Sequence, residues 1–226
     1  MLLNKLIYIL PGRWNKHIYN LIKRYYSKPR NVNFKGLPLT LNPTVFHPKL
    51  YLTTETFLDY LLTLDLDGMT TLELGCGSAA ISLYIANQLQ ATVHVSDINP
   101  AAIDGVNENA KRLDLDVATH ISDLFDEIPL MSIDVLIINP PFFASKIESI
   151  DEYAFNAGDE YQYFKKLSNQ LVDRAKMIQN TYMILTDKCD LDSIFACFPT
   201  PTFSILEVSR HQSHGEVHLI YSVAVA

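Results

Sequence analysis

Residues 72–81 read Leu-Glu-Leu-Gly-Cys-Gly-Ser-Ala-Ala-Ile, and this stretch decides the fold. The short apolar run at 71–74 is suited to a β-strand. Gly75 and Gly77 predict a tight turn in which no Cβ keeps a ligand away from the backbone N–H groups. Ser78 is a good N-cap, and apolar side chains follow it at helical spacing. A strand that leads through a glycine turn into a helix is typical of the nucleotide crevice of doubly wound α/β folds.

The glycine turn alone leaves the class of nucleotide cofactor open. A dinucleotide-binding fingerprint has a third glycine at the position that Ala80 occupies here. Residues 93–100 read Val-His-Val-Ser-Asp-Ile-Asn-Pro and predict a second buried strand, which ends at Asp97. Asp97 follows Gly75 by 22 residues, and a carboxylate at that distance can accept both hydroxyl groups of an adenosine ribose.

A third motif, at 133–142, reads Ile-Asp-Val-Leu-Ile-Ile-Asn-Pro-Pro-Phe, a buried strand that ends in Asn-Pro-Pro-Phe. Here the chain resembles the class I S-adenosylmethionine-dependent methyltransferases. Within them it is similar to the group whose fourth strand ends in Asn-Pro-Pro-aromatic and which methylates nitrogens of planar groups. Members act on adenine N6, on guanine N2 in ribosomal RNA, or on the glutamine amide of peptide-chain release factors. The resemblance rests on motif spacing and covers residues 45–225.

The resemblance implies S-adenosylmethionine as the cofactor. Glu73 would accept a hydrogen bond from the cationic amino-acid part of the cofactor, or else orient the loop. Asp97 would accept the ribose hydroxyls, cap the following helix, or do both. The Asp123 carboxylate would face the adenine amino group, and the next backbone N–H, of Leu124, would face adenine N1. The predicted cofactor-binding residues are Glu73, Gly75, Cys76, Gly77, Asp97, Ile98, Asp123, Leu124 and, by a looser correspondence, Thr54.

Residues 139–142 form the predicted acceptor site. Pro140 and Pro141 stiffen the loop and remove two N–H donors, which leaves carbonyl groups as acceptors. The Asn139 side-chain oxygen and the Pro140 carbonyl can each accept one N–H of a planar amine, while Phe142 stacks on the acceptor. Held in this way, the nitrogen lone pair faces the methyl group, and no strong base is needed. Asn139, Pro140 and Phe142 are therefore predicted to be catalytic, mainly through orientation.

Composition indicates a globular protein of one domain with a short appendage. The chain has 226 residues, of which 48% are hydrophobic, 11% aromatic and 19% charged. It contains no apolar run long enough to predict a transmembrane helix. The three cysteines lack metal-ligand spacing, so no metal site is predicted. Their odd number favours a reduced, cytoplasmic protein.

Charge is divided unevenly along the chain. Residues 1–54 contain nine Lys and Arg and no Asp or Glu, so the remainder, with nine basic and all 25 acidic residues, has a balance of −16. Apolar and basic residues at 13–26 predict an amphipathic helix. This helix could pack on the catalytic domain, contact RNA, or lie on a membrane surface. The predicted division is a basic N-terminal helical extension and linker at 1–44 and a methyltransferase domain at 45–226.

Regular alternation of strands and helices predicts the architecture. We expect an α/β, Rossmann-like doubly wound fold whose mostly parallel, seven-stranded sheet ends in a C-terminal antiparallel hairpin. A helix that starts near Thr54 or Glu55, with Thr53 or Thr54 as its N-cap, precedes the first strand of this sheet. The polar stretch 143–152 reads as a substrate-facing loop. Predicted strands are 71–75, 91–97, 116–121, 133–138, 181–186, 202–210 and 216–225, and predicted helices are 78–90, 100–113, 159–178 and 190–197.

The predicted function is methyl transfer from S-adenosylmethionine to a planar nitrogen. The basic N-terminus favours an exocyclic amine of an RNA base as the acceptor, with protein glutamine as the alternative and a small-molecule amine third. A nicotinamide-dependent oxidoreductase would use the same crevice but leaves residues 139–142 without a role. A non-catalytic RNA- or membrane-binding protein with a degenerate fold is the other competing interpretation.

Overall fold

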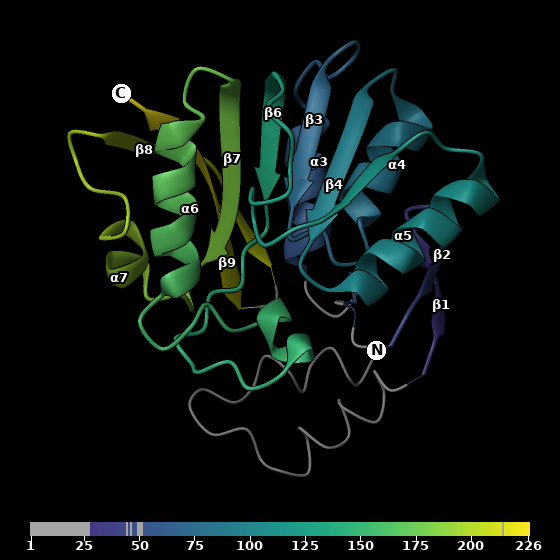
Figure 1. Ribbon diagram of the computed structural model, residues 1–226, viewed down its shortest axis with the longest axis horizontal. Helices are drawn as coiled ribbons and strands as arrows, with labels where there is room; N and C mark the ends of the chain where they lie inside the picture. The colour runs from purple at the N-terminus through teal and green to yellow at the C-terminus, as the bar shows by residue number, and fades with distance from the viewer. Residues whose placement is uncertain (1–27, 44, 46, 49–51, 214) are drawn as a thin grey trace.

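The computed structural model describes residues 28–226, apart from 44, 46, 49–51 and 214. A seven-stranded sheet in the order β5-β4-β3-β6-β7-β9-β8 lies between two layers of helices (Figure 1). The pairs among β3 to β7 are parallel, whereas β9 runs antiparallel to both β7 and β8. The predicted fold class is therefore confirmed, including a last strand inserted antiparallel. The helix predicted at 13–26 lies outside the described residues.

The strands are close to the predicted ranges. Central strand β6 is buried at five of its six positions, because helices cover both of its faces. The hairpin of β8 and β9 has an irregular register between Glu207 and Ser209. The sheet consists of β3 (Thr70–Leu74), β4 (Thr92–Asp97), β5 (Ala118–Ile121), β6 (Ile133–Ile138), β7 (Ile178–Thr186), β8 (Phe203–Ser213) and β9 (Glu216–Val225).

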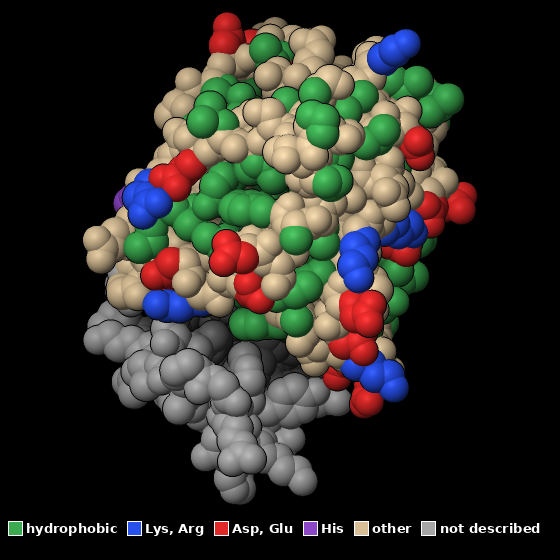
Figure 2. Space-filling model, turned by 90° about the vertical axis from the view of Figure 1, so that its left-hand side faces the viewer, with side chains coloured by type: hydrophobic (Ala, Val, Ile, Leu, Met, Phe, Trp, Pro, Cys, Tyr) green, Lys and Arg blue, Asp and Glu red, His purple; other side chains and the backbone are tan. Residues whose placement is uncertain are grey.

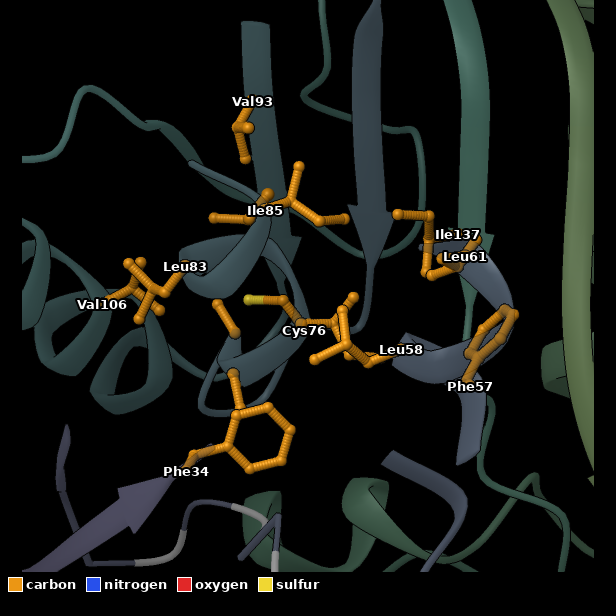
Figure 3. Packing of buried hydrophobic residues seen from close by; sticks show 14 of the residues in the cluster. Phe34, Phe57, Leu58, Leu61, Cys76, Leu83, Ile85, Val93, Val106 and Ile137 are labelled. Carbon is orange, nitrogen blue, oxygen red and sulfur yellow. The ribbon is translucent and has the colours of Figure 1, made fainter. Parts of the chain in front are cut away.

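Two hydrophobic clusters cover the two faces of the sheet. Helices α3 (Thr53–Leu61), α4 (Ala80–Gln88) and α5 (Pro100–Leu113) contribute to one cluster, part of which Figure 3 shows. Helices α6 (Gln162–Asp173) and α7 (Leu191–Phe195) contribute to the other. Successive residues of a strand point to opposite faces, so Leu136 and Ile137 of β6 belong to different clusters. The core therefore holds the strand ends of β3, β4 and β6 in fixed positions.

A separate hairpin joins the N-terminal part of the described chain to α5. It consists of β1 (Arg30–Phe34) and β2 (Leu37–Leu41), which pair antiparallel. The Asn109 side chain of α5 accepts a hydrogen bond from Thr40 N and donates one to Thr40 O, both at 2.8 Å. The predicted boundary between residues 44 and 45 stays a prediction, since most of the first segment lies outside the described residues.

Two predicted helix caps are wrong. Helix α4 begins at Ala80, and its N-cap is Ala79, which has a left-handed φ of 49° and makes no side-chain cap, so Ser78 belongs to the preceding turn. Helix α3 begins at Thr53 after Leu52, whose backbone is already helical at φ −73° and ψ −12°. Thr53 and Thr54 therefore lie inside the first turn, where they cannot act as the N-cap.

Among the helices that the structure describes, none combines the length and the apolar character that crossing a bilayer requires.

Candidate active site

The candidate site lies at the carboxyl ends of β3, β4 and β6, near the short 3-10 helix η1 (Ile150–Ala154) (Figure 1). Strand β3 has β4 on one side and β6 on the other, so the chain reverses its direction of winding here. Such a switch point opens a crevice at the edge of a parallel sheet. All the residues predicted for the site line this one pocket: Thr54, Glu73, Gly75, Cys76, Gly77, Asp97, Ile98, Asp123, Leu124, Asn139, Pro140, Pro141 and Phe142. Their individual roles stay predictions.

The glycine turn is built from left-handed backbone. Gly75, Gly77 and Ala79 have φ angles of 64°, 51° and 49°. A Cβ added to Gly75 would meet no atom within 4 Å, so this part of the turn faces open space. Cys76 N donates to Ser96 O at 2.9 Å, which ties the turn to β4. The Cys76 side chain is buried in the hydrophobic cluster of which Figure 3 shows a part, and its Sγ lies 3.9 Å from Gly77 O.

Asp97 connects the turn to the loop that precedes α5. Its Oδ2 accepts a hydrogen bond from Gly77 N at 2.7 Å, and its Oδ1 accepts one from Asn99 N at 2.9 Å. Burial raises the pKa of the Asp97 carboxyl, while these backbone N–H groups oppose the rise. The N-cap of α5 is Asn99, whose Oδ1 accepts from Ala101 N at 3.0 Å. Asp97 therefore supports the glycine turn, whereas Asn99, two residues further on, caps α5.

Glu73 ties β3 to α4. The residue is only 4% exposed, and its Oε2 accepts hydrogen bonds from the N–H and the hydroxyl group of Ser82. Burial, with a smaller contribution from the charge of Asp97, raises the pKa of Glu73 to about 7, although the two bonds from Ser82 oppose the rise. Glu73 also forms part of the pocket wall, and its two predicted roles, toward the cofactor and in orienting the loop, stay predictions.

The loop after β5 is held in place from α6. Lys166 Nζ lies 2.6 Å from Asp123 Oδ2 and 2.6 Å from Asp126 Oδ2. Leu124 adopts a left-handed φ of 55°, and its carbonyl accepts a hydrogen bond from the Ser122 hydroxyl at 2.8 Å. The two residues predicted to face the adenine therefore belong to a loop with a defined shape.

The corner at 139–142 follows β6 and faces the same pocket as the glycine turn. The ring of Phe142 packs on the exposed ring of Phe143, with 4.7 Å between centroids. Phe143 N donates to Phe155 O at 3.0 Å, and Ala157 N donates to Phe143 O at 2.8 Å. These two bonds close residues 143–157 into a loop that begins and ends beside the corner.

This loop adds pocket residues to the predicted set: Ile150, which lies within the stretch predicted to face the substrate, and Tyr153, which lies just beyond it. The predicted substrate-facing stretch 143–152 contains the start of η1, from which Ile150 and Tyr153 line the pocket. Both are large hydrophobic residues that remain 42% and 40% exposed. No sequence motif marks these two residues, because it is the folded shape of the loop that brings them to the pocket.

Two hydroxyl groups that line the pocket are buried and have no hydrogen-bond partner in the described part of the chain. They belong to Thr54, at the start of α3, and to Tyr163, in the first turn of α6. Thr54 is among the predicted residues, whereas Tyr163 is not. Within the same part of the chain, no group of three or more His, Cys, Asp and Glu side chains is placed to hold a metal ion.

Comparison with known proteins places these features in a family. The model of the methyltransferase small domain matches residues 37–156. A release factor glutamine methyltransferase from Streptococcus pneumoniae is 34% identical over 119 residues, which cover 52% of this chain and 42% of that protein. A human release factor glutamine methyltransferase is 32% identical over 154 residues, covering 57% of this chain and 45% of its own length. The chain thus spans less than half the length of these two relatives.

Solved structures share the fold at low sequence identity. The Mtq2-Trm112 complex of E. cuniculi aligns with a TM-score of 0.59 and 18% identity over 81% of this chain and 99% of that chain. The 16S rRNA N2 G1207 methyltransferase of T. thermophilus aligns with a TM-score of 0.56 and 18% identity, covering 85% of this chain and 49% of that chain. Because the family model matches more than half of the 226 residues, the chain belongs to the methyltransferase small domain family.

Proposed function

We propose that this protein is an S-adenosylmethionine-dependent N-methyltransferase whose acceptor is the side-chain amide of a glutamine in a protein. The observation that carries the proposal is that the glycine turn and the Asn-Pro-Pro-Phe corner line a single pocket. The glutamine acceptor is favoured by the relatives from S. pneumoniae and human, both named as release factor glutamine methyltransferases. The similar E. cuniculi complex is described as methylating a translation termination factor.

The residues of the pocket fit the proposed cofactor. The open space beside Gly75 leaves room for a ligand against the backbone of the turn, and Thr54 offers a buried hydroxyl that has no partner in the described chain. Asp97 and Asp123 would hold the nucleoside, and Glu73 the amino-acid end. When bound, S-adenosylmethionine supplies a methyl group on a positively charged sulfur.

The corner at 139–142 would position the acceptor. The side-chain oxygen of Asn139 and the carbonyl of Pro140 each accept one N–H of the amide nitrogen, and Phe142 stacks on the amide plane. Held by both of its N–H groups, the nitrogen presents its lone pair toward the methyl group. The nitrogen loses its proton after it attacks, so the chain needs to supply orientation more than basicity.

An exocyclic amine of an RNA base is the second candidate acceptor. The nine Lys and Arg among residues 1–54 favour it, because basic residues contribute phosphate affinity. The geometry of the corner serves an aromatic amine as well as an amide, since both present a planar NH₂. Residues 1–27, which hold five of those nine charges, lie outside the described part of the chain.

Cofactor class and chemistry can be tested together. We expect calorimetry to detect binding of S-adenosylmethionine and not of NAD. Asn139→Ala should lower the methylation rate by about 100-fold or more, because misplacing an acceptor has effects of that size. Its affinity for the cofactor should stay within about twofold of the wild type, since Asn139 contacts the acceptor. Asn169→Ala, at an exposed position of α6, is the matched control and should change neither quantity.

The acceptor class can be tested with labelled cofactor and a cell extract. We expect protein-bound label that protease removes and RNase does not. Label removed by RNase would replace glutamine with an RNA base as the acceptor. Failure of the folded wild-type protein to bind S-adenosylmethionine would overturn the whole proposal.

A further inference from the structure

The hydroxyl group of Tyr163 is a buried donor without a partner. It belongs to a residue that lines the candidate active site, and no described residue forms a hydrogen bond with it. The rest of Tyr163 is well anchored: its backbone N–H donates to Ala157 O at 3.0 Å, and its ring packs edge-on against Phe164 with 5.2 Å between centroids. Buried hydroxyl groups are rarely left unpaired, so this one is a candidate to donate a hydrogen bond to an acceptor atom of a ligand.

The carboxylates that line the pocket do not accept a hydrogen bond from the Tyr163 hydroxyl. Asp97 and Asp123 line the same pocket as Tyr163, and their charges act on its hydroxyl. In the described chain these carboxylates bond to other groups: Asp97 accepts backbone N–H groups of Gly77 and Asn99, and Oδ2 of Asp123 is paired with Lys166 at 2.6 Å. Because no described group accepts this hydroxyl, a molecule that enters the pocket can supply the acceptor.

We propose that Tyr163 is a cofactor-binding residue, whose hydroxyl donates a hydrogen bond to the nucleoside part of S-adenosylmethionine. The inference rests on the proposed function for the identity of the cofactor. The nucleoside is the part expected to lie between Asp97 and Asp123, and both an adenine ring and a ribose carry acceptor atoms. The contact would add a residue of α6 to the elements that hold the cofactor.

The protonation state of Tyr163 suits this role. Burial raises the pKa of the phenol far above its usual range, and the carboxylates of Asp97 and Asp123 raise it further. Tyr163 therefore keeps its proton at neutral pH and acts as a donor. A base or a nucleophile at this position would require the opposite shift.

The test is the affinity of Tyr163→Phe for two ligands, S-adenosylhomocysteine and 5′-methylthioadenosine, measured by calorimetry. The substitution removes one oxygen atom and keeps the ring, so we expect the thermal unfolding temperature to remain unchanged. Both ligands should bind about three- to tenfold more weakly, as expected for one hydrogen bond. Tyr161→Phe is the control, because the hydroxyl of Tyr161 bonds to Asp190 outside this pocket, and it should bind both ligands like the wild type.

Analogues of S-adenosylhomocysteine would identify the acceptor atom. Three analogues lack adenine N3, adenine N7 or the ribose ring oxygen, respectively. We expect one of them to bind the wild-type protein more weakly than the parent ligand and to bind Tyr163→Phe as well as the parent does. This coupling would not arise if the tyrosine had only a structural role.

The results separate a failure of this inference from a failure of the proposed function. If the wild type binds neither ligand, this inference and the proposed function are both wrong. If the wild type binds them and Tyr163→Phe binds them equally well, only this inference is wrong. A loss of affinity confined to S-adenosylhomocysteine would place the contact at the amino-acid end of the cofactor. A change confined to the KM of the acceptor would place the contact on the acceptor substrate. Either result overturns the nucleoside contact.

Discussion

At the residue scale, Gly75 and Gly68 form a matched pair. Both have left-handed φ angles, 64° and 75°, and a Cβ on either would meet no atom within 4 Å. Only Gly75 lines the candidate site, whereas Gly68 precedes β3 at the opposite end of the strand. We expect either alanine variant to lower the free energy of unfolding by about 1 kcal/mol through backbone strain alone.

The two variants should differ in cofactor binding. Gly75→Ala should weaken S-adenosylmethionine binding at least about tenfold, because its methyl group projects where the ligand approaches the turn. Gly68→Ala should bind like the wild type. Urea unfolding and calorimetry measure the two effects separately, and equal affinities for both variants would mean that the cofactor does not approach Gly75.

Glu73 makes a pH-dependent contribution to stability. Burial raises its pKa from the usual 4.5 to about 7, so the folded chain holds this proton more tightly than the unfolded chain does. Its contribution to the free energy of unfolding is therefore fully present below pH 4.5 and is lost as the pH rises through about 7. Glu73→Gln, which stays neutral, should show a smaller fall in stability over this range.

Urea unfolding of both proteins at a series of pH values between about 4.5 and 7 measures the difference. Ser82→Ala is a useful companion, since it removes the hydroxyl donor to Glu73 Oε2 and leaves the carboxyl in place. Parallel pH profiles for the wild type and Glu73→Gln would show that the buried carboxyl remains ionised throughout.

At the scale of elements, η1 and its loop should govern the acceptor rather than the cofactor. Ile150 and Tyr153 are exposed apolar side chains that line the pocket, and loss of one such contact would be worth roughly 1.5 kcal/mol, or about tenfold in binding. We expect Tyr153→Ala to raise the KM of the protein acceptor about tenfold and to leave cofactor affinity unchanged. Steady-state kinetics with each substrate varied in turn measures both.

Leu206→Ala controls for the general loss of apolar surface. Leu206 on β8 is 63% exposed and does not belong to the pocket lining. Its substitution should alter neither the KM nor the cofactor affinity. A Tyr153→Ala variant with normal acceptor KM but weakened cofactor binding would assign η1 to the cofactor half of the site.

At the scale of the whole molecule, charge distinguishes the two acceptor classes. The chain has a net charge of −7, and side chains of both signs are scattered over the face shown in Figure 2. We expect the methylation rate of a protein acceptor to change by less than about threefold between roughly 50 and 200 mM salt. An RNA acceptor bound through six to ten phosphates would lose about 10³ to 10⁵ in affinity over this range.

Initial rates with subsaturating acceptor measure this dependence, and cofactor affinity at each salt concentration serves as the control. A steep decline of the methylation rate with salt, at unchanged cofactor affinity, would favour an RNA acceptor. It would also assign a phosphate-binding role to the basic N-terminal residues.

The sequence alone determined the order of the elements and the meeting of its three motifs. Short apolar runs alternate with segments of helical periodicity, and this alternation specifies a parallel sheet. The carboxyl ends of parallel strands lie at one edge of the sheet. Glu73, Asp97 and Asn139 could therefore be assigned to one site by their positions at strand ends, before any contact was known.

Tertiary structure alone decided which side chains from other elements reach that edge. Tyr163 faces the pocket because the loop at 143–157 closes on Phe143 and sets where α6 begins. The left-handed Ala79 displaces the N-cap expected at Ser78, since the turn must meet both β4 and α4. Such positions depend on contacts between segments far apart in the chain, which local periodicity and residue preference do not encode.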